Sequence, residues 1–423
     1  LMKKTEEVLN SIQKSNKKYN QFEFIPSYDM YKNFEKVSTS FFSNPEGKRF
    51  YFSAKDIFNT YVYPTEMGSQ TFKDFFPGNN ARVITDCITD GDFCIGKTVT
   101  SEFAVHEETD VLNPWNSSAT VGTSSAGSAI NILVDQDIDY SLATQTAGSI
   151  GRPASYCGVR GFKPSYGLVP RTGVLKTCDP FDTVGFFIKT FDVLEKVMNT
   201  TFKISSNFPQ NKKIHVLKKL DTKNFIIPSI EGISFSKESE EHVDEVKSFL
   251  IDNGYSFLDI QLPEFVSQIH NMHEKIYSFS LSYYFTQDLE SRGSKLSDSF
   301  KNFVERCKAV ESQEFQRLID LHQKYVQDFN NWLYENSIDL ILFPSTNGVA
   351  PKRGDPEMDD LNLIMTYLHL PVCYIPSGFN EKLRMPFGIG ISGKRFADYA
   401  LVELAKEIES NFPQNGGKYF EEV

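Results

Sequence analysis

The chain has 423 residues, of which 40% are hydrophobic and 23% are charged, and its formal net charge at pH 7 is −11. These values are typical of a soluble globular protein with a large core, and no apolar run is long enough to cross a bilayer. The acidic balance argues against the chain being the main contact to a nucleic acid, because phosphates attract basic surfaces. A basic partner could still supply that contact. Six scattered cysteines predict neither a disulfide framework nor a zinc site.

Helical and apolar strand-like segments alternate along the chain. Hydrophobic periodicity predicts helices over 1–20, 80–90, 237–253 and 396–412, and a long helical tract over 262–336. Short apolar runs predict strands at 49–54, 93–95, 256–260, 338–344 and 387–391. This order predicts an α/β fold around a mixed sheet. Because no sharp linker interrupts the chain, we expect one domain over 1–423, with an exposed loop at 203–213.

One glycine-rich segment matches the pattern of a phosphate-binding loop, Gly91-Asp-Phe-Cys-Ile-Gly-Lys-Thr98. Taken alone, the pattern would indicate an ATPase. However, Asp92 would repel phosphate, and the apolar run at 93–95 is expected to form a strand inside the supposed loop. The residues after Thr98 are also a poor start for the helix that such a loop requires. We therefore do not expect a nucleotide to bind at this segment.

Two segments rich in serine and glycine flank an apolar stretch. They read Gly122-Thr-Ser-Ser-Ala-Gly-Ser-Ala129 and Thr144-Gln-Thr-Ala-Gly-Ser-Ile-Gly-Arg-Pro-Ala154. Small residues let backbone N–H groups approach a ligand, and a hydroxyl placed there can attack it once a base accepts its proton. No histidine is adjacent in sequence, although a distant one could approach in space, and no Gly-x-Ser-x-Gly elbow is present. The other base that serves a serine is a neutral lysine, and Lys55 follows an apolar strand that could bury it.

The blocks around these residues resemble the amidase signature family. In chain order they are Ala54-Lys-Asp56, Gly96-Lys-Thr98, Ser101-Glu-Phe-Ala104, Asn113-Pro-Trp-Asn116, the two serine-rich segments, Cys157-Gly-Val-Arg-Gly-Phe-Lys-Pro-Ser-Tyr-Gly167 and Asp182-Thr-Val-Gly185. The similarity is clear over 50–190 and weaker over 338–410. Within the family, the blocks at 113–116 and 163–167 are most similar to the A subunits of glutamyl-tRNA(Gln) amidotransferases.

This resemblance implies the amidase signature fold, which is a large mixed and twisted β-sheet covered by helices on both faces. It divides the single domain into three parts. They are an N-terminal helical segment at 1–45, the signature core at 50–190, and a C-terminal half at 191–423 that carries a helical insertion and substrate-side loops.

The resemblance also implies the catalytic residues. The family's lysine base corresponds to Lys55, its bridging serine, held by a cis peptide, to Ser124, and its nucleophile to Ser149. In that scheme Ser149 attacks a primary amide, and its proton passes through Ser124 to neutral Lys55. The oxyanion would be held by the backbone N–H groups of Thr146, Ala147, Gly148 and Ser149. Ser125 and Ser128 would be supporting hydrogen-bonding residues.

Several positions depart from the family's pattern. Threonine or alanine stands at 123, 126 and 147, where glycine is usual, and Gln145 replaces an aspartate. The arginine expected directly after Ser-Ile is replaced by Gly151, with Arg152 one place later. All three triad positions are present, so we expect a catalytically competent chain.

Glutamine as a substrate would need groups that recognise its α-ammonium and its α-carboxylate. The resemblance assigns the ammonium to Asp359, with Asp360 as a close rival, in an acidic loop that could equally be only solvated. The family's carboxylate-binding arginine falls near His322, which would alter carboxylate recognition. Lys352 and Arg353 are the candidate substitutes.

The resemblance therefore implies a glutaminase that hydrolyses glutamine within a larger complex and passes ammonia to a partner. The implied partners are an amidotransferase B subunit, which would hold Glu-tRNA(Gln) and use ATP and Mg, and a small third subunit. No cofactor and no membrane insertion are expected for this chain itself. Two alternatives stay open, a stand-alone amidase for a small primary amide and a non-catalytic scaffold. A mitochondrial location is expected, or otherwise the cytoplasm of a bacterium.

Overall fold

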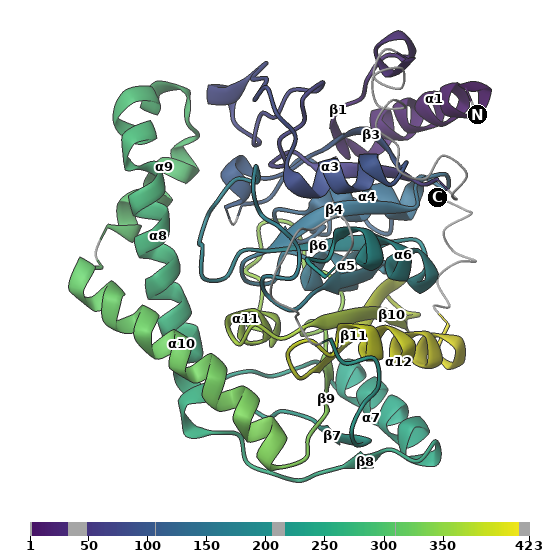
Figure 1. Ribbon diagram of the computed structural model, residues 1–423, viewed down its shortest axis with the longest axis vertical. Helices are drawn as coiled ribbons and strands as arrows, with labels where there is room; N and C mark the ends of the chain where they lie inside the picture. Colours follow the sequence, from purple (N-terminus) through teal and green to yellow (C-terminus); the bar gives the residue numbers. More distant parts are fainter. Residues whose placement is uncertain (1, 33–48, 106, 205–215, 309, 414–423) are drawn as a thin grey trace.

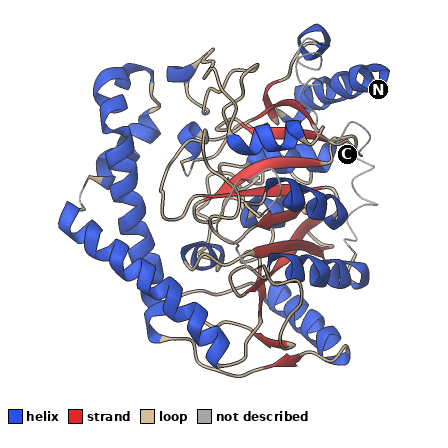
Figure 2. Ribbon diagram, in the orientation of Figure 1, coloured by secondary structure: helices blue, strands red, loops and turns tan. Residues whose placement is uncertain are grey.

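The computed structural model describes residues 2–32, 49–105, 107–204, 216–308 and 310–413. Most of the loop expected at 203–213 lies outside these residues. A mixed sheet of 11 strands runs through the molecule in the order β1-β3-β2-β4-β6-β5-β10-β11-β9-β7-β8 (Figure 1). Helices lie on both sides of this sheet (Figure 2). The α/β class with a mixed sheet is therefore as predicted.

The strands are β1 (Phe22–Phe24), β2 (Tyr51–Lys55), β3 (Phe93–Thr98), β4 (Tyr140–Gln145), β5 (Arg160–Lys163), β6 (Thr183–Ile188), β7 (Asn224–Ile226), β8 (Ser256–Phe257), β9 (Leu340–Pro344), β10 (Val372–Asn380) and β11 (Met385–Gly393). The strand predicted at 256–260 is shorter than expected, because β8 lies at the sheet edge and pairs with β7 at only two positions. Strand β6 is buried at every position and is mostly apolar, so it lacks the polar alternation that makes a strand visible in sequence.

Two hydrophobic cores lie on opposite faces of the sheet, since successive residues of a strand such as β10 enter one core and then the other. We call the first the α4/α5 face. It carries α1 (Met2–Tyr19), α4 (Ala126–Val134), α5 (Gly151–Cys157) and α11 (Asn362–Tyr367). We call the second the α6/α12 face. It carries α3 (Arg82–Thr89), α6 (Phe191–Thr201), α7 (Lys237–Asp252) and α12 (Asp398–Asn411).

The helical tract predicted at 262–336 is a set of three helices that stands beside the sheet (Figure 1). They are α8 (Ile269–Arg292), α9 (Asp298–Cys307) and α10 (Ser312–Glu335). The chain turns at Gly293 into a short 3-10 turn before α9, and Ser297 then caps α9 by accepting a hydrogen bond from the backbone of Phe300. A separate small core joins α8 and α9 to Phe103 and Val105 of the sheet side.

The alternation along β2 decides where its polar residues point. Phe52 and Ala54 enter the core of the α6/α12 face. Ser53 and Lys55 therefore point to the opposite face, where α4 begins. Ser53 is fixed there by hydrogen bonds to Asn131 of α4 and Ser141 of β4, each 2.6 Å long. The candidate lysine base thus enters the α4/α5 face because of its position in the strand.

Candidate active site

Lys55 is the last residue of β2, and its side chain is fully buried. Its Nζ is hydrogen-bonded to three hydroxyl groups, those of Ser124 at 2.8 Å, Thr144 at 3.0 Å and Ser125 at 3.2 Å. Burial lowers the pKa of Lys55 from 10.5 to about 7, while the negative charge of Asp182 acts in the opposite direction. A lysine in this state can accept a proton near neutral pH.

The serine pair lies where the chain turns into α4. Gly122 has a φ of +93°, and a Cβ there would lie 2.8 Å from the Pro153 side chain, so this position requires glycine. Inside α4, a Cβ on Gly127 would clash with the backbone oxygen of Gln21. The small residues of the first serine-rich segment therefore allow α4 to pack close enough to bring Ser124 to Lys55.

The cis peptide that the resemblance implies at Ser124 is not found. The described residues contain no cis peptide bond. The bond before Ser124 does not involve proline, and for such bonds the trans form is the ordinary one. Ser124 nevertheless reaches Lys55 Nζ, so the trans chain places its hydroxyl on the candidate base.

Ser149, the candidate nucleophile, lies in the turn between β4 and α5 and is half-buried. Its Oγ lies 3.3 Å from Oγ1 of Thr123. Among the hydrogen bonds of the described residues, this contact replaces the expected one between Ser149 and Ser124. Thr123 stands where the family usually has glycine, so its hydroxyl is an addition that the resemblance does not imply. Thr123 and Ser124 are neighbours in the chain, and the two serine-rich segments therefore meet at this point.

The turn that holds Ser149 is fixed through its carbonyl oxygens. The Thr146 oxygen accepts a hydrogen bond from His273 Nε2 at 2.9 Å, and the Ala147 oxygen accepts one from the Thr366 hydroxyl at 2.9 Å. Burial lowers the pKa of His273 to about 4, so this histidine is neutral and donates through Nε2. In the described part of the chain the N–H groups of Ala147, Gly148 and Ser149 have no such partner. They are available to an oxyanion.

The side-chain amide of Gln145 also fixes the turn that holds Ser149. Its Oε1 accepts hydrogen bonds from the N–H groups of Ile150 and Gly151, at 2.8 and 2.9 Å. Its Nε2 donates to the hydroxyls of Thr366 and Tyr374, at 2.9 and 3.0 Å. A neutral amide thus satisfies four buried polar groups around the nucleophile turn at the position where the family usually has an aspartate.

Replacing Gln145 by leucine is expected to lower kcat at least about tenfold and the free energy of unfolding by about 2–4 kcal/mol. The reason is that four buried hydrogen-bonding groups lose their partner at once. Steady-state kinetics and urea unfolding measure the two effects. Ser392→Ala is the control. Ser392 of β11 is also buried, but its hydroxyl donates its 2.8 Å hydrogen bond to the Pro371 carbonyl and not to the turn that holds Ser149. An unchanged kcat in Gln145→Leu would contradict this role.

Asp182 lies directly before β6 and is hydrogen-bonded to the turn that holds Ser149. Its carboxylate accepts hydrogen bonds from Thr146 Oγ1 at 2.7 Å, from the Thr177 backbone at 2.9 Å and from the Cys178 backbone at 3.0 Å. It is also the charge that acts on Lys55. Asp182 belongs to the Asp-Thr-Val-Gly block of the resemblance, but sequence reasoning gives it no role. In the structure Asp182 positions Thr146 through a hydrogen bond and acts on Lys55 through its charge.

The two acids proposed for the substrate ammonium lie in different surroundings. Asp360 is buried and accepts a hydrogen bond from Arg152 Nε at 2.7 Å, so its charge is already paired. Glu357 pairs with the same guanidinium, also at 2.7 Å. The side chain of Asp359 is 69% exposed and lies 4.0 Å from His270 Nδ1, on the helix that carries His273. Asp359 is therefore the acid of this pair that stays open to a ligand.

His322, where the resemblance places the family's arginine, and the two candidate substitutes, Lys352 and Arg353, lie in different surroundings. His322 is buried and hydrogen-bonded to the Tyr367 carbonyl at 2.9 Å, and burial lowers its pKa to about 4, so it is neutral. Arg353 donates to the carbonyl of Val111 at 2.9 Å and to that of Thr109, and so holds the 109–111 segment. Lys352 is exposed and its backbone forms a bridge to Ala119.

The segment that resembles a phosphate-binding loop is strand β3. Lys97 is fully buried in it, and its Nζ donates to Asp56 at 2.9 Å, to Thr65 Oγ1 at 2.9 Å and to the Pro64 carbonyl at 3.2 Å. A strand with a buried, paired lysine cannot wrap a phosphate. The prediction that this segment contains a strand is confirmed, and Lys97 anchors Asp56, the residue next to Lys55.

Replacing Lys97 by alanine is expected to lower the free energy of unfolding by about 3–5 kcal/mol, because it leaves the buried Asp56 carboxylate without its counter-charge. Urea unfolding measures the change. Lys73→Ala is the matched control: Lys73 pairs with Glu66 at 2.7 Å, but its side chain is 51% exposed. We expect this control to lose at most about 1 kcal/mol. Equal losses in the two variants would contradict the argument.

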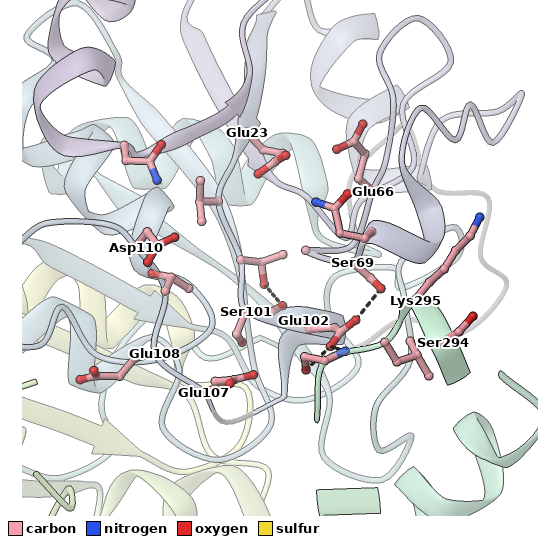
Figure 3. A pocket seen from close by; sticks show the side chains of 18 residues that line it. Glu23, Glu66, Ser69, Ser101, Glu102, Glu107, Glu108, Asp110, Ser294 and Lys295 are labelled. Carbon is pink, nitrogen blue, oxygen red and sulfur yellow. Dashed lines mark hydrogen bonds between the residues drawn. The ribbon is translucent and has the colours of Figure 1, made fainter. Parts of the chain in front are cut away.

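A pocket of about 430 Å³ lies apart from this site, between the sheet edge and the turn before α9 (Figure 3). Acidic side chains gather around it, among them Glu23, Glu66 and Glu102. Glu102 is committed to structure, since it accepts hydrogen bonds from the hydroxyls of Ser69 and Ser297, each at 2.5 Å. Glu102 of the Ser101–Ala104 block therefore holds Ser297, the residue that caps α9.

Within the described residues, no group of three or more histidine, cysteine, aspartate or glutamate side chains is placed to hold a metal ion. Among the described helices, none combines the length and apolar character needed to cross a membrane.

Comparison with protein families and with curated proteins gives consistent matches. The family model described as Amidase matches residues 4–402. The A subunit of glutamyl-tRNA(Gln) amidotransferase from Thermoanaerobacter pseudethanolicus is 26% identical over 402 residues, which covers 84% of this chain and 81% of that protein. The protein of the same name from Methanosarcina barkeri is 25% identical over 404 residues and covers 84% and 83%.

Solved structures match over nearly the whole chain. The allophanate hydrolase of Kluyveromyces lactis superposes with a TM-score of 0.85 at 20% identity, covering 98% of this chain and 71% of that one. The crystal structure of the glutamyl-tRNA(Gln) amidotransferase A subunit from Thermotoga maritima gives a TM-score of 0.77 at 23% identity, covering 98% and 92%. At these identities the likeness shows the fold, which agrees with the predicted architecture.

Proposed function

This chain belongs to the amidase family, and we propose that it hydrolyses the side-chain amide of glutamine and supplies the ammonia to a partner that amidates Glu-tRNA(Gln). The observation that carries the proposal is the buried Lys55, which has a pKa of about 7 and lies 2.8 Å from Ser124 beside a half-buried Ser149. The curated relatives, named as A subunits of glutamyl-tRNA(Gln) amidotransferases, support glutamine as the amide.

In the proposed reaction Ser149 Oγ attacks the amide carbonyl and Lys55 is the final acceptor of its proton. A neutral amine donates two hydrogens and accepts one. Because Ser125 uses its own hydroxyl hydrogen on the Thr144 carbonyl, at 3.2 Å, it must accept from Lys55. This leaves the Nζ lone pair for the hydroxyl hydrogen of Ser124 or Thr144. The N–H groups of the 146–149 turn would hold the oxyanion, ammonia would leave with the returned proton, and water would release glutamate.

The names of the relatives also support a complex. We propose that an amidotransferase B subunit holds Glu-tRNA(Gln) and uses ATP and Mg, that a small third subunit joins the two, and that this acidic chain binds no tRNA itself. Asp359 is our candidate for contacting the α-ammonium group of glutamine. The proposed location is the mitochondrion, with the bacterial cytoplasm as the alternative.

A small primary amide is the second candidate substrate. It is favoured by one observation, that His322 is neutral and buried and that Arg353 is occupied by backbone carbonyls. A substrate without a carboxylate would need neither residue. In this case the chain would act alone with the same serine and lysine.

The experiment that separates the two is affinity purification of the chain at endogenous level, followed by two assays. The proposed function predicts that the co-purified complex converts Glu-tRNA(Gln) to Gln-tRNA(Gln) with glutamine, ATP and Mg. It would be wrong if the chain purifies without partners and hydrolyses propionamide faster than glutamine. Fractionation of the source cells tests the location.

A further inference from the structure

On the α6/α12 face, away from Lys55, a histidine lies between a serine and a glutamate. His242 is in α7, and its Nε2 lies 2.8 Å from the Oγ of Ser377 in β10. Its Nδ1 lies 3.2 Å from a carboxylate oxygen of Glu245, one helical turn further along α7. Three side chains are thus linked in the order hydroxyl, imidazole and carboxylate, which is the order of a serine nucleophile with its base and orienting acid.

The partners of His242 decide where its proton lies. A carboxylate only accepts hydrogen bonds, so Nδ1 must carry the hydrogen that is shared with Glu245. Burial lowers the pKa of His242 below 6.5, although Glu245 acts in the opposite direction, so the ring is neutral at pH 7. The Nε2 lone pair then faces Ser377 and can accept the hydrogen of its hydroxyl. This is the tautomer that a general base for serine needs.

The backbone of β10 explains how Ser377 reaches α7. The register of β10 against β11 shifts between Ile375 and Gly378, which places Ser377 in an irregular part of the strand. Ile375 belongs to the core of the α6/α12 face, and Tyr374, which contacts Gln145, belongs to the other core. Ser377 and Ser149 therefore lie on opposite faces of one sheet, and the two serines cannot share a substrate.

The ring of His242 is held by aromatic neighbours and opens on a cavity. Phe387 and Phe412 meet it edge to face, with centroid distances of 5.6 and 5.8 Å. The cavity has a volume of about 480 Å³ and is lined by Ser377, His242 and Glu245 among others. Its lining includes four glutamates, at 238, 241, 245 and 381, and one lysine, at 382. Such a cavity admits a small acyl group and repels an anionic one.

We propose that Ser377 is a second nucleophilic serine of this chain, which cleaves small neutral or cationic carboxylic esters with His242 as its base and Glu245 as the group that orients the base. Ser377 Oγ forms a bond to the ester carbonyl carbon while His242 Nε2 takes its proton. The bond to the alkoxide breaks and Nε2 returns the proton to it, so the alcohol leaves. Water then attacks the acyl carbon of the acyl-serine while Nε2 takes a proton from that water. The bond from the acyl carbon to Ser377 Oγ breaks, Nε2 gives this proton to Ser377 Oγ, and the carboxylic acid is released.

The test labels the full chain with a biotin-linked fluorophosphonate, which replaces its fluoride with a reactive serine oxygen, and locates the adduct by peptide mass spectrometry. Ser149→Ala is the parent variant, so that only other serines can react. The proposal predicts an adduct on Ser377 and no loss of it when Ser248 of α7, an exposed serine, is also replaced by alanine. Absence of an adduct on Ser377, while an unrelated serine hydrolase labels in parallel, would overturn it.

The base is tested by His242→Gln in the same parent, because glutamine can still hydrogen-bond Ser377 but cannot take its proton. Labelling is expected to slow at least tenfold, and an unchanged rate would show that the contact only fastens α7 to β10. If circular dichroism shows that this variant does not fold, Glu245→Gln replaces it, with an expected slowing of labelling of at least threefold.

The substrate class is tested with p-nitrophenyl esters. In Ser149→Ala, turnover of the acetate should exceed that of the hydrogen succinate at least tenfold, and the opposite order would overturn the substrate class.

Discussion

The Ser149→Ala variant is expected to hydrolyse glutamine at least about 10⁴-fold more slowly than the parent chain. Ser149 lies in the 146–149 turn, and the other hydroxyl of that turn, on Thr146, is hydrogen-bonded to Asp182 at 2.7 Å. Without the Ser149 Oγ no acyl intermediate can form, and removal of the nucleophile alone abolishes most of the rate enhancement in serine enzymes. The assay is glutamate release, measured with the co-purified complex.

A matched control separates chemistry from folding in this experiment. Ser128→Ala also removes a hydroxyl from the serine-rich segments, but Ser128 bonds Thr98 at 2.7 Å and the Leu142 carbonyl at 3.1 Å inside the core. It should lose stability and retain most of its kcat. In the complex, Ser149→Ala should also keep amidation of Glu-tRNA(Gln) when ammonium chloride replaces glutamine, because the partner's chemistry is intact. If glutamine-dependent amidation survives in Ser149→Ala, the proposed nucleophile is wrong.

Much of this site could be predicted from short segments of sequence. Lys55 ends an apolar strand, and a strand's alternation fixes the face to which its last residue points. The small residues of the first serine-rich segment are visible in sequence, but their role in packing is not: the structure shows that a Cβ at Gly122 or Gly127 would clash with neighbouring segments. The match of residues 91–98 to a phosphate-binding loop could also be rejected from the segment itself, because the apolar residues at 93–95 predict a strand.

The parts that sequence reasoning missed depend on contacts between distant segments. His273 holds the Thr146 carbonyl across 127 positions of the chain, and Gln145 meets Tyr374 across 229. Neither residue belongs to a local pattern, so only the packing of α8 and β10 against the turn brings them together. The contact of Ser149 with Thr123 was missed for another reason, since the resemblance implies a cis peptide that the described residues do not contain.

Replacing Lys55 by methionine is expected to abolish hydrolysis and to change the pH dependence of stability. Methionine fills a similar volume but carries no base, so the rate should fall by about 10³-fold or more. In the parent chain kcat/KM should fall about tenfold per pH unit below pH 7, because Lys55, with a pKa of about 7, must be neutral to accept the proton. A pH profile of glutamate release from pH 5.5 to 9 measures both.

The stability effect follows from the lowered pKa. Between pH 7 and about 10.5 the unfolded chain holds a proton on Lys55 that the folded chain lacks, so falling pH favours the unfolded state. Burying Lys55 therefore destabilises the parent most below pH 7, and the penalty disappears as pH rises through 10.5. Lys55→Met has no such group. Relative to it, the parent should gain about 1 kcal/mol of unfolding free energy per pH unit between pH 7.5 and 9.5.

Lys163 supplies a matched control for this last experiment. It is equally buried, its pKa is also lowered by burial to about 7, and its Nζ donates to the carbonyls of Pro164 and Leu370 and to no serine. Lys163→Met should reproduce the pH-dependent difference in stability while retaining glutamine hydrolysis. Denaturant unfolding at pH 7.5, 8.5 and 9.5 measures the slope for both variants. Two flat slopes would mean that these lysines stay charged when folded, and a charged Lys55 could not be the base.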